Sequence, residues 1–509
     1  MPKQSNTENN KRIAKNTILL YFRMIFLMLI SLYTSRVVLN TLGVEDYGIY
    51  NVVGGVVTIF AFLNAAMNAS TQRYITFYLG KGDINNLRKV FSNCMYIHMI
   101  LAAIVVFLAE TIGLWFLYNK MIIPDARVDA AFWVFQCSIV VTVIMILSAP
   151  YNADIIAHER MSAFAYISIA EAILKLLVVF LLSISGIDKL ILYAILLLIV
   201  QIMIRYVYGR YCNKHFIESH LIYDIDKQQF KEMSSFIGWN VFGGLSGVMY
   251  TQGLNMLLNV FFGPVVNAAR GIAVQVQNVV LQFSQNFQTA INPQITKSYA
   301  TGNLSQMHNL IYKSSKYTFF LLLLISLPVF LEAKPLLTLW LKIVPDWTVT
   351  FLRIMLCITL VDSVANPLMV SSAATGKVKL YQSVIGGTML SIVPIAYICL
   401  KLGCNPSAVF VVHLSLCLIT FIMRLFIIRP MIKLSIRAYL KNVVIICFIV
   451  GIVSIILPLS MYILLDDTIK NEIVIMLFAC FCSLISVFFI GFTSNERKFV
   501  LEKLRKNNI

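Results

Sequence analysis

The sequence predicts an all-α, polytopic membrane protein with about 14 transmembrane helices. Of its 509 residues, 59% are hydrophobic and only 13% are charged, whereas soluble chains carry about a quarter charged residues. Mean hydropathy is +0.82. The apolar runs reach about 20 residues, enough for a helix to cross roughly 30 Å of hydrocarbon. The predicted spans are residues 17–42, 47–70, 94–118, 130–152, 161–184, 188–210, 236–260, 267–291, 317–333, 348–371, 380–400, 407–428, 442–464 and 472–492.

The distribution of basic residues predicts the orientation of these spans. Segments on the side of the N-terminus hold 27 of the 41 lysines and arginines, and those on the opposite side hold 7. Under the positive-inside rule, this bias and an even number of spans place both termini in the cytoplasm. We therefore interpret the net charge of +18 as membrane topology and not as a surface for nucleic acid. The ten cysteines show no zinc-like spacing, and we expect no metal or cofactor.

A polar connector occurs twice in the chain. The stretch "ITFYLGKGDINNLRKVFS" from residue 75 aligns without a gap with "ITKSYATGNLSQMHNLIY" from residue 295, so that Gly82 matches Gly302. The same offset aligns Gly43 with Gly263. The repeat predicts two pseudo-symmetric six-helix lobes that share one orientation, the parallel-repeat design of some transporters. The predicted parts are a cytoplasmic tail 1–16, an N-lobe 17–210, a linker 211–235, a C-lobe 236–428, two C-terminal helices with their preceding loop in 429–492, and a basic tail 493–509.

Polar side chains occupy matching places in the two lobes. Amides recur on one helical face of the span 267–291, and three more follow the same spacing in the span 236–260. At an offset of 219, the latter three align with Tyr33, Arg36 and Asn40. Such amides can join helices, but two matching stripes favour a water-filled cavity, where amides would suit sugar hydroxyls. The two stripes are Gln275, Asn278, Gln282 and Gln285, and Gln252, Asn255 and Asn259.

Charged residues inside the predicted spans are mostly basic. Arg205, Arg353 and Arg424 lie near span ends, where their side chains can reach the interface. Glu171 and Lys175 stand one helical turn apart, so they can form an ion pair or contact substrate. The excess of cations favours an anionic substrate, since the guanidinium fork suits phosphate. The basic residues are Arg23, Arg36, Lys175, Arg205, Arg270, Arg353 and Arg424, and the acidic ones are Glu110, Glu171 and Asp362.

The chain resembles a family of bacterial membrane proteins. The segments "NKRIAKNTILLYFRMI", "SRVVLNTLGVEDYGIYNVV" and "TQRYITFYLGKGD" resemble those of the polysaccharide-biosynthesis flippases. These are the Wzx-type O-antigen or capsule transporters of the multidrug/oligosaccharidyl-lipid/polysaccharide exporter superfamily. The resemblance implies movement of undecaprenyl-diphosphate-linked oligosaccharide across the bacterial inner membrane by alternating access between two lobes. It also implies contact with membrane lipid and with other polysaccharide-assembly proteins, and an apolar groove for the lipid tail at the two C-terminal helices.

Two other functions remain open at this point. A cation-coupled drug or metabolite exporter of the same superfamily would use intramembrane carboxylates, for which Asp362 and Glu171 are the candidates. The basic excess disfavours this alternative. A membrane polysaccharide polymerase or ligase is the second alternative, and the short outer segments, of about 11–16 residues, disfavour it. We therefore expect a transporter and not an enzyme, with the two amide stripes and Arg23, Arg36, Asn40 and Arg270 as candidate substrate contacts.

Overall fold

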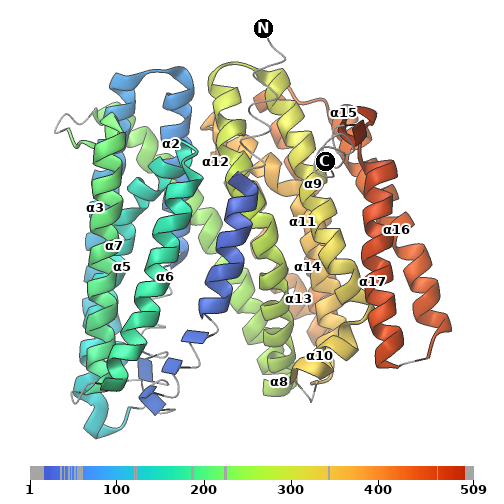
Figure 1. Ribbon diagram of the computed structural model, residues 1–509, viewed down its shortest axis with the longest axis horizontal. Helices are drawn as coiled ribbons and strands as arrows, with labels where there is room; N and C mark the ends of the chain where they lie inside the picture. The colour runs from blue at the N-terminus through green and yellow to red at the C-terminus, as the bar shows by residue number, and fades with distance from the viewer. Residues whose placement is uncertain are drawn as a thin grey trace, which may run out of the picture. The chain divides into compact units, whose positions relative to one another are not determined.

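The computed structural model describes residues 16–31, 33–34, 37–38, 41–43, 46, 49–50, 53, 61–119, 121, 123–184, 188–222, 226–341, 344–466 and 468–498. The regular structure in these ranges is entirely helical (Figure 1). The chain divides into two compact units, Met1–Gly244 and Leu245–Ile509. Ten helices in the described ranges are long and apolar enough to cross a membrane. The all-α membrane fold is thus confirmed, while the count of 14 spans is not.

The four other predicted spans are the ones with weak apolar character or incomplete description. The first contains the short apolar helix Asn16–Ser31, and the second overlaps helix α2, Ala61–Lys81. The seventh and eighth are the two limbs of α8, Lys227–Ala300, whose backbone leaves the helical conformation at Gly263 with φ 78°. Gly43, its counterpart in the repeat, has φ 82°. The amides on both limbs of α8 make it less apolar, and neither limb is among the ten apolar helices.

The first unit is built around α5. This helix packs against α2, α3, α6 and α7. Its core contains Val134 and Phe135, both fully buried. A Cβ added to Gly113 would lie 2.7 Å from the Phe135 ring, so only glycine allows this close approach. The remaining elements are α3 (Ile84–Leu108), η1 (Ala109–Gly113), α4 (Leu114–Asn119), η2 (Asp125–Arg127), α5 (Val128–Ala157), α6 (Met161–Ile184), α7 (Lys189–His215) and η3 (Ile217–Ser219).

The second unit is built around α11. This helix packs against α9 and α14, and α16 and α17 pack against each other and against α9. Phe351 of α11 meets Phe410 of α14 with ring centroids 4.5 Å apart. The elements after α8 are α9 (Leu304–Leu331), α10 (Ala333–Leu341), α11 (Thr348–Thr375), α12 (Lys379–Leu390), α13 (Ile392–Lys401), α14 (Ala408–Ile432), α15 (Ile436–Tyr439), η4 (Leu440–Val444), α16 (Ile445–Leu464), α17 (Ile469–Ser486) and η5 (Val487–Gly491).

The outer faces of α16 and α17 are apolar. Large hydrophobic side chains such as Phe448, Leu457, Leu477 and Phe481 are more than half exposed. A soluble surface rarely leaves so many neighbouring apolar side chains uncovered. These two helices are therefore suited to contact lipid.

The two polar connectors adopt the same turn. α2 ends at Lys81 and α3 begins at Ile84, with Gly82 between them at φ 70°. In the second copy, Gly302 has φ 73°. Asp83 accepts a hydrogen bond from the Asn86 amide, and Asn303 accepts one from the Gln306 amide, so each caps the helix that follows. The alignment of the connectors at an offset of 220 is confirmed here, while the domain boundaries stay a prediction.

The segment predicted as a linker is partly helical. α8 begins at Lys227, and its first turns belong to the first unit, where they pack on α2. Asn240 Nδ2 donates to Ser70 Oγ at 3.2 Å, and the rings of Phe236 and Tyr74 lie 5.2 Å apart.

An ion-pair network holds together three segments of the first unit. Arg127 Nε donates to Asp46 Oδ1 at 2.8 Å, and its Nη1 lies 2.5 Å from Asp188 Oδ2. Asp188 also accepts hydrogen bonds from the amides of Leu190 and Ile191, which caps α7. Asp46 comes from the "GVEDYG" motif, so this motif residue has a structural role.

Candidate functional site

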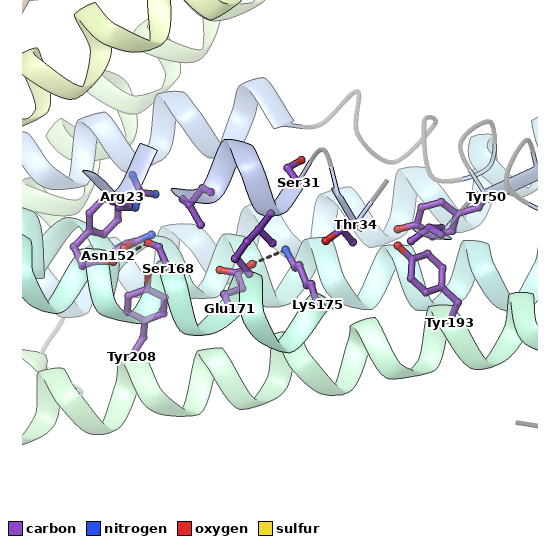
Figure 2. Close-up of a pocket in the computed structure, with 15 residues that line it drawn as sticks. Arg23, Ser31, Thr34, Tyr50, Asn152, Ser168, Glu171, Lys175, Tyr193 and Tyr208 are labelled. Carbon is purple, nitrogen blue, oxygen red and sulfur yellow. Dashed lines mark hydrogen bonds and ion pairs between the residues drawn. The ribbon is translucent and has the colours of Figure 1, made fainter. Parts of the chain in front are cut away.

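The first unit contains a pocket of about 520 Å³. Its walls come from the helix Asn16–Ser31 and the residues that follow it, and from α5, α6 and α7. Figure 2 shows Arg23, Asn152, Ser168 and Tyr208 at one end, Glu171 and Lys175 in the middle, and Tyr50 and Tyr193 at the other end. The lining residues are Arg23, Leu27, Ile30, Ser31, Thr34, Val38, Tyr50, Asn152, Phe164, Ser168, Glu171, Ala172, Lys175, Tyr193 and Tyr208.

Arg23 forms no ion pair within 4.0 Å among the residues that the structure describes. Its guanidinium lies over the ring of Phe164, 4.4 Å from the centroid. Its Nε is buried and has no hydrogen-bond partner in the same part of the chain. A cation–π contact supplies only part of the stabilisation that a half-buried guanidinium needs. The side chain therefore retains the capacity to bind an anion.

Glu171 and Lys175 form the ion pair that their spacing predicts. Lys175 Nζ lies 2.6 Å from Glu171 Oε1. The acidic residue precedes the basic one by four positions, which is the favourable order on a helix. Their side chains keep 25% and 43% of their exposure, for Glu171 and Lys175 respectively, so both reach the pocket. Whether they also contact substrate stays a prediction.

Several polar atoms in the pocket wall have no partner. Thr34 Oγ1 and Asn152 Oδ1 are buried and make no hydrogen bond within the part of the chain that the structure describes, as is also true of Arg23 Nε. Buried polar atoms in native proteins are nearly always bonded. In a pocket, such atoms are the groups that orient a ligand. At the far end, the rings of Tyr50 and Tyr193 meet edge to face at 4.9 Å.

The pocket carries one excess positive charge. Its described lining contains the cations Arg23 and Lys175 and the single anion Glu171, and the ion pair cancels two of these three charges. The remaining side chains are hydroxyls, one amide and apolar groups. The pocket therefore favours a ligand that combines a negative charge with hydroxyl groups.

The second unit holds the other candidate arginine that is described. Arg270 on α8 is 7% exposed. Its Nη1 donates to Asn255 Oδ1 and its Nη2 to the Thr251 carbonyl, both at 2.9 Å. These bonds join the two limbs of α8. Asn255 was predicted to line a cavity. In the structure it accepts a hydrogen bond from Arg270, and its neutral amide leaves the positive charge of Arg270 uncompensated.

The amide stripe on the second limb of α8 is exposed. Gln277, Ser284 and Gln288 face the interior, and Gln277 Nε2 bonds to Thr359 Oγ1 at 2.8 Å. The helix thus has an inward polar face that joins it to α11 and an outward one that is free to meet water or ligand. The exposed residues are Gln252 and Asn259 on the first limb and Gln275, Asn278, Gln282 and Gln285 on the second. Their role in substrate binding stays a prediction.

Asp362 has a basic partner. Arg424 Nη1 lies 3.5 Å from Asp362 Oδ1, and the Arg424 side chain is only 12% exposed. The Arg424 guanidinium turns toward the carboxylate on the neighbouring helix. Its expected reach to the membrane interface stays a prediction. Arg353 instead bonds to the carbonyls of Phe330 and Leu331 at the end of α9. The coupling role of Asp362 stays a prediction.

Two candidates cannot be placed, and several pocket residues were missed. Arg36 and Asn40 lie outside the described residues. The sequence analysis did not identify Asn152 on α5 or Tyr193 and Tyr208 on α7. A partial signal exists in α6, where Ser168, Glu171 and Lys175 recur at helical spacing on one face. A search for polar stripes in the N-lobe would have found that face.

Comparison with solved structures places this fold among known transporters. A mutant MATE protein superposes with a TM-score of 0.73 at 14% identity, covering 84% of this chain and 97% of that chain. The chain has the fold of MATE transporters. An outward-facing multidrug resistance MATE transporter of the MOP superfamily gives a TM-score of 0.68 at 16% identity, with 84% and 96% covered. A MOP superfamily transporter from Pyrococcus furiosus, described as having a binding pocket of reverse polarity, gives 0.66 at 15% identity, with 85% and 96% covered.

Sequence comparison adds no closer assignment. No family model matches the chain, and no curated protein matches it. The resemblance to the flippases therefore has support only at the level of the fold that the superfamily shares.

Proposed function

We propose that this chain is a membrane transporter that moves a lipid-linked, anionic oligosaccharide from one leaflet to the other. In its full form, the proposal is an alternating-access flippase for undecaprenyl-diphosphate-linked oligosaccharide in the bacterial inner membrane, serving surface polysaccharide synthesis. The single observation that carries it is Arg23, a half-buried arginine that has no ion-pair partner among the described residues and that lines a pocket rich in hydroxyls. A guanidinium binds phosphate through two parallel hydrogen bonds.

The size of the pocket limits what it can hold. A volume of about 520 Å³ lies within the usual range for small-molecule sites, and a whole lipid-linked oligosaccharide is larger. We therefore assign to it the diphosphate and the sugar next to it. The hydroxyls and the Asn152 amide would bind the sugar, because each can accept hydrogen bonds from sugar hydroxyls.

A second cationic pocket in the first unit supports an anionic lipid. This pocket, of about 760 Å³, is lined by Arg205, Arg210, Lys214 and His220 together with two tyrosines. None of the three lysine and arginine side chains has an ion pair within the described ranges. They lie at the end of α7 that is predicted to be cytoplasmic, where basic residues attract anionic headgroups.

The alternative is a cation-coupled drug exporter. One of the solved structures with this fold is a multidrug resistance transporter, and a drug exporter would need a carboxylate that is free to bind a cation. In this chain, Glu171 and Asp362 each have a basic partner, at 2.6 Å and 3.5 Å. This pairing supports the flippase over the drug exporter.

Transport by purified protein tests the proposal. Proteoliposomes containing a polyprenyl-diphosphate-linked saccharide would be treated with a soluble lectin, and the fraction of saccharide that the lectin can reach would be followed over time. We expect wild type to exchange the saccharide between leaflets and Arg23→Ala to slow exchange at least about tenfold, since a hydrogen bond to a charged group contributes about 1.5–3 kcal/mol. Arg23→Lys should retain part of the rate.

The controls separate the three functions. Lys401→Ala changes an exposed cation of the second unit and should leave the rate unchanged. Export of a cationic dye without exchange of the saccharide would instead establish the drug exporter. A change in the mass of the saccharide would indicate a polymerase or ligase. Equal rates in wild type and Arg23→Ala would remove the pocket from the mechanism.

A further inference from the structure

Three side chains of metal-ligand type converge in the first unit, and none of them lines the pocket described above. Asp154 and His158 stand one turn apart at the end of α5, and Glu218 belongs to η3. One ligand atom from each lies within 4.8 Å of the other two. His158 Nε2 is 2.5 Å from Glu218 Oε1 and 3.7 Å from Asp154 Oδ1.

Asp154 is the residue that requires an explanation. It is fully buried, and neither of its carboxylate oxygens accepts a hydrogen bond from any group that the structure describes. The Glu218 carboxylate that faces it offers only acceptors. Apart from His158 at 3.7 Å, no described group compensates this carboxyl, and a buried carboxylate is destabilising unless it is protonated or binds a cation.

The three side chains cannot neutralise one another if both carboxyls are ionised. Two ionised carboxylates would carry two negative charges, and His158 would supply at most one positive charge. Arg205 does not make up the difference, because its guanidinium lies over the Tyr151 ring at 4.1 Å and forms no ion pair with Asp154 or Glu218. The thiol of Cys212, also nearby, donates to the Tyr151 carbonyl at 3.5 Å.

We propose that Asp154, His158 and Glu218 bind one divalent transition-metal ion of the zinc class. A divalent ion with a neutral imidazole balances the two carboxylates. Tetrahedral ligands at about 2.1 Å from zinc lie about 3.4 Å from one another, and the observed separations of 2.5 and 3.7 Å bracket that value. One imidazole with two carboxylates suits zinc or its transition-metal neighbours better than magnesium, which prefers oxygen ligands alone.

The ligands are held in place by contacts that do not involve the ion. The His158 ring stacks on Phe216 with centroids 4.1 Å apart and planes within 8°. Ser219 Oγ donates to the Phe216 carbonyl at 2.8 Å, and the Ile222 amide donates to Ser92 Oγ on α3 at 2.9 Å. η3 is thereby fixed beside α5 before any ion binds. His158 keeps 25% of its side-chain exposure, which gives the ion a route from solvent.

The acid-base chemistry of metal ligands gives the site a pH dependence. An imidazole nitrogen that binds a metal carries no proton, so protons compete with the ion and metal binding should weaken in acid. The bound ion would join η3 to the end of α5.

Metal binding to the full chain in detergent tests the proposal. Protein carrying a tag without histidine would be stripped with a chelator and titrated with Zn²⁺ by calorimetry in two buffers of different ionisation enthalpy. We expect one Zn²⁺ per chain, release of a proton, and a rise in Tm. Co²⁺ should give visible absorption bands of a site with nitrogen and oxygen ligands. Mg²⁺ at the same concentration should have no effect.

Matched variants locate the site. His158→Asn and Glu218→Gln should each lower Zn²⁺ affinity at least tenfold and abolish the cobalt bands. His215→Asn, which changes an exposed histidine in the same segment, should change neither. The proposal fails if wild type binds no more Zn²⁺ than His158→Asn, or if His215→Asn removes the binding. The proposal also fails if Zn²⁺ does not raise the Tm of metal-free wild type while Asp154→Asn does raise the Tm. A proton shared between the two carboxyl groups would then explain the cluster.

Discussion

Substitutions that change the net charge of the pocket should rank its affinity for anionic ligands. The wild-type lining carries one excess positive charge, from Arg23 and Lys175 against Glu171. Glu171→Gln raises this excess to two, and Lys175→Gln lowers it to zero. We expect a diphosphate ligand to bind most tightly to Glu171→Gln, less tightly to wild type and least tightly to Lys175→Gln.

The magnitude follows from Coulomb's law and from exposure. A unit charge about 8 Å from a ligand charge contributes about 2 kcal/mol at an effective dielectric constant of roughly 20. The Lys175 side chain is 43% exposed and that of Glu171 is 25% exposed, so solvent screening reduces this to about 1 kcal/mol. Each substitution should therefore change Kd by roughly fivefold, in opposite directions.

The assay is titration of each purified variant with a short-chain polyprenyl diphosphate, followed by intrinsic fluorescence. The double variant Glu171→Gln with Lys175→Gln restores the net charge of wild type and should restore its affinity to within about twofold. Equal affinities in all four proteins would refute the electrostatic reasoning. The opposite order, with a cationic dye bound best by Lys175→Gln, would support the drug exporter.

Two further predictions concern stability. Gly82→Ala and Gly302→Ala should each lower the free energy of unfolding by about 1–2 kcal/mol, the cost of a left-handed conformation for a residue with a Cβ. A Cβ at either position meets no atom within 4 Å, so the expected loss comes from the backbone alone. Gly238→Ala is the control, because Gly238 is helical and equally open. A loss of stability in the two connector variants no greater than that in Gly238→Ala would contradict the backbone argument. Burial raises the pKa of Glu496, but the hydroxyl of Tyr317 and the amide of Thr493 more than offset this and hold it below its ordinary 4.5. The stability that the Glu496 carboxylate contributes is therefore present above about pH 4.5 and is lost as pH falls through the lower pKa of the folded state. The Tm values of wild type and Glu496→Gln should differ at pH 7 and converge in acid. A difference in Tm that stays constant with pH would contradict this prediction.

The fold could be predicted because its signals are local. The span predicted at 161–184 coincides with α6, since a run of apolar residues is sufficient to define a membrane helix. The two connectors were placed correctly because Gly82 and Gly302 mark turns that few other residues tolerate. The limbs of α8 were predicted as spans from their length, although they carry many amides and are not among the ten apolar helices.

The candidate site was only partly predictable because it depends on contacts between distant segments. Arg23 was predicted as a candidate substrate contact, and the structure places it beside Asn152 and Tyr208, which lie far along the chain (Figure 2). Amide periodicity could not show which face of α8 is exposed, because Gln277 and Gln275 are both polar and face opposite ways. Cysteine spacing gave no sign of the proposed metal site, which contains no cysteine.

The two copies of the connector also contain a natural substitution. Asp83 caps α3 with a carboxylate, and Asn303 caps α9 with an amide, through the same bond to the amide three residues later. The carboxylate adds a negative charge at the positive end of the α3 dipole, which the neutral amide of the second copy does not. Since both caps form, geometry alone is enough to start these helices. Duplication has left the charge at this position free to diverge between two otherwise equivalent turns.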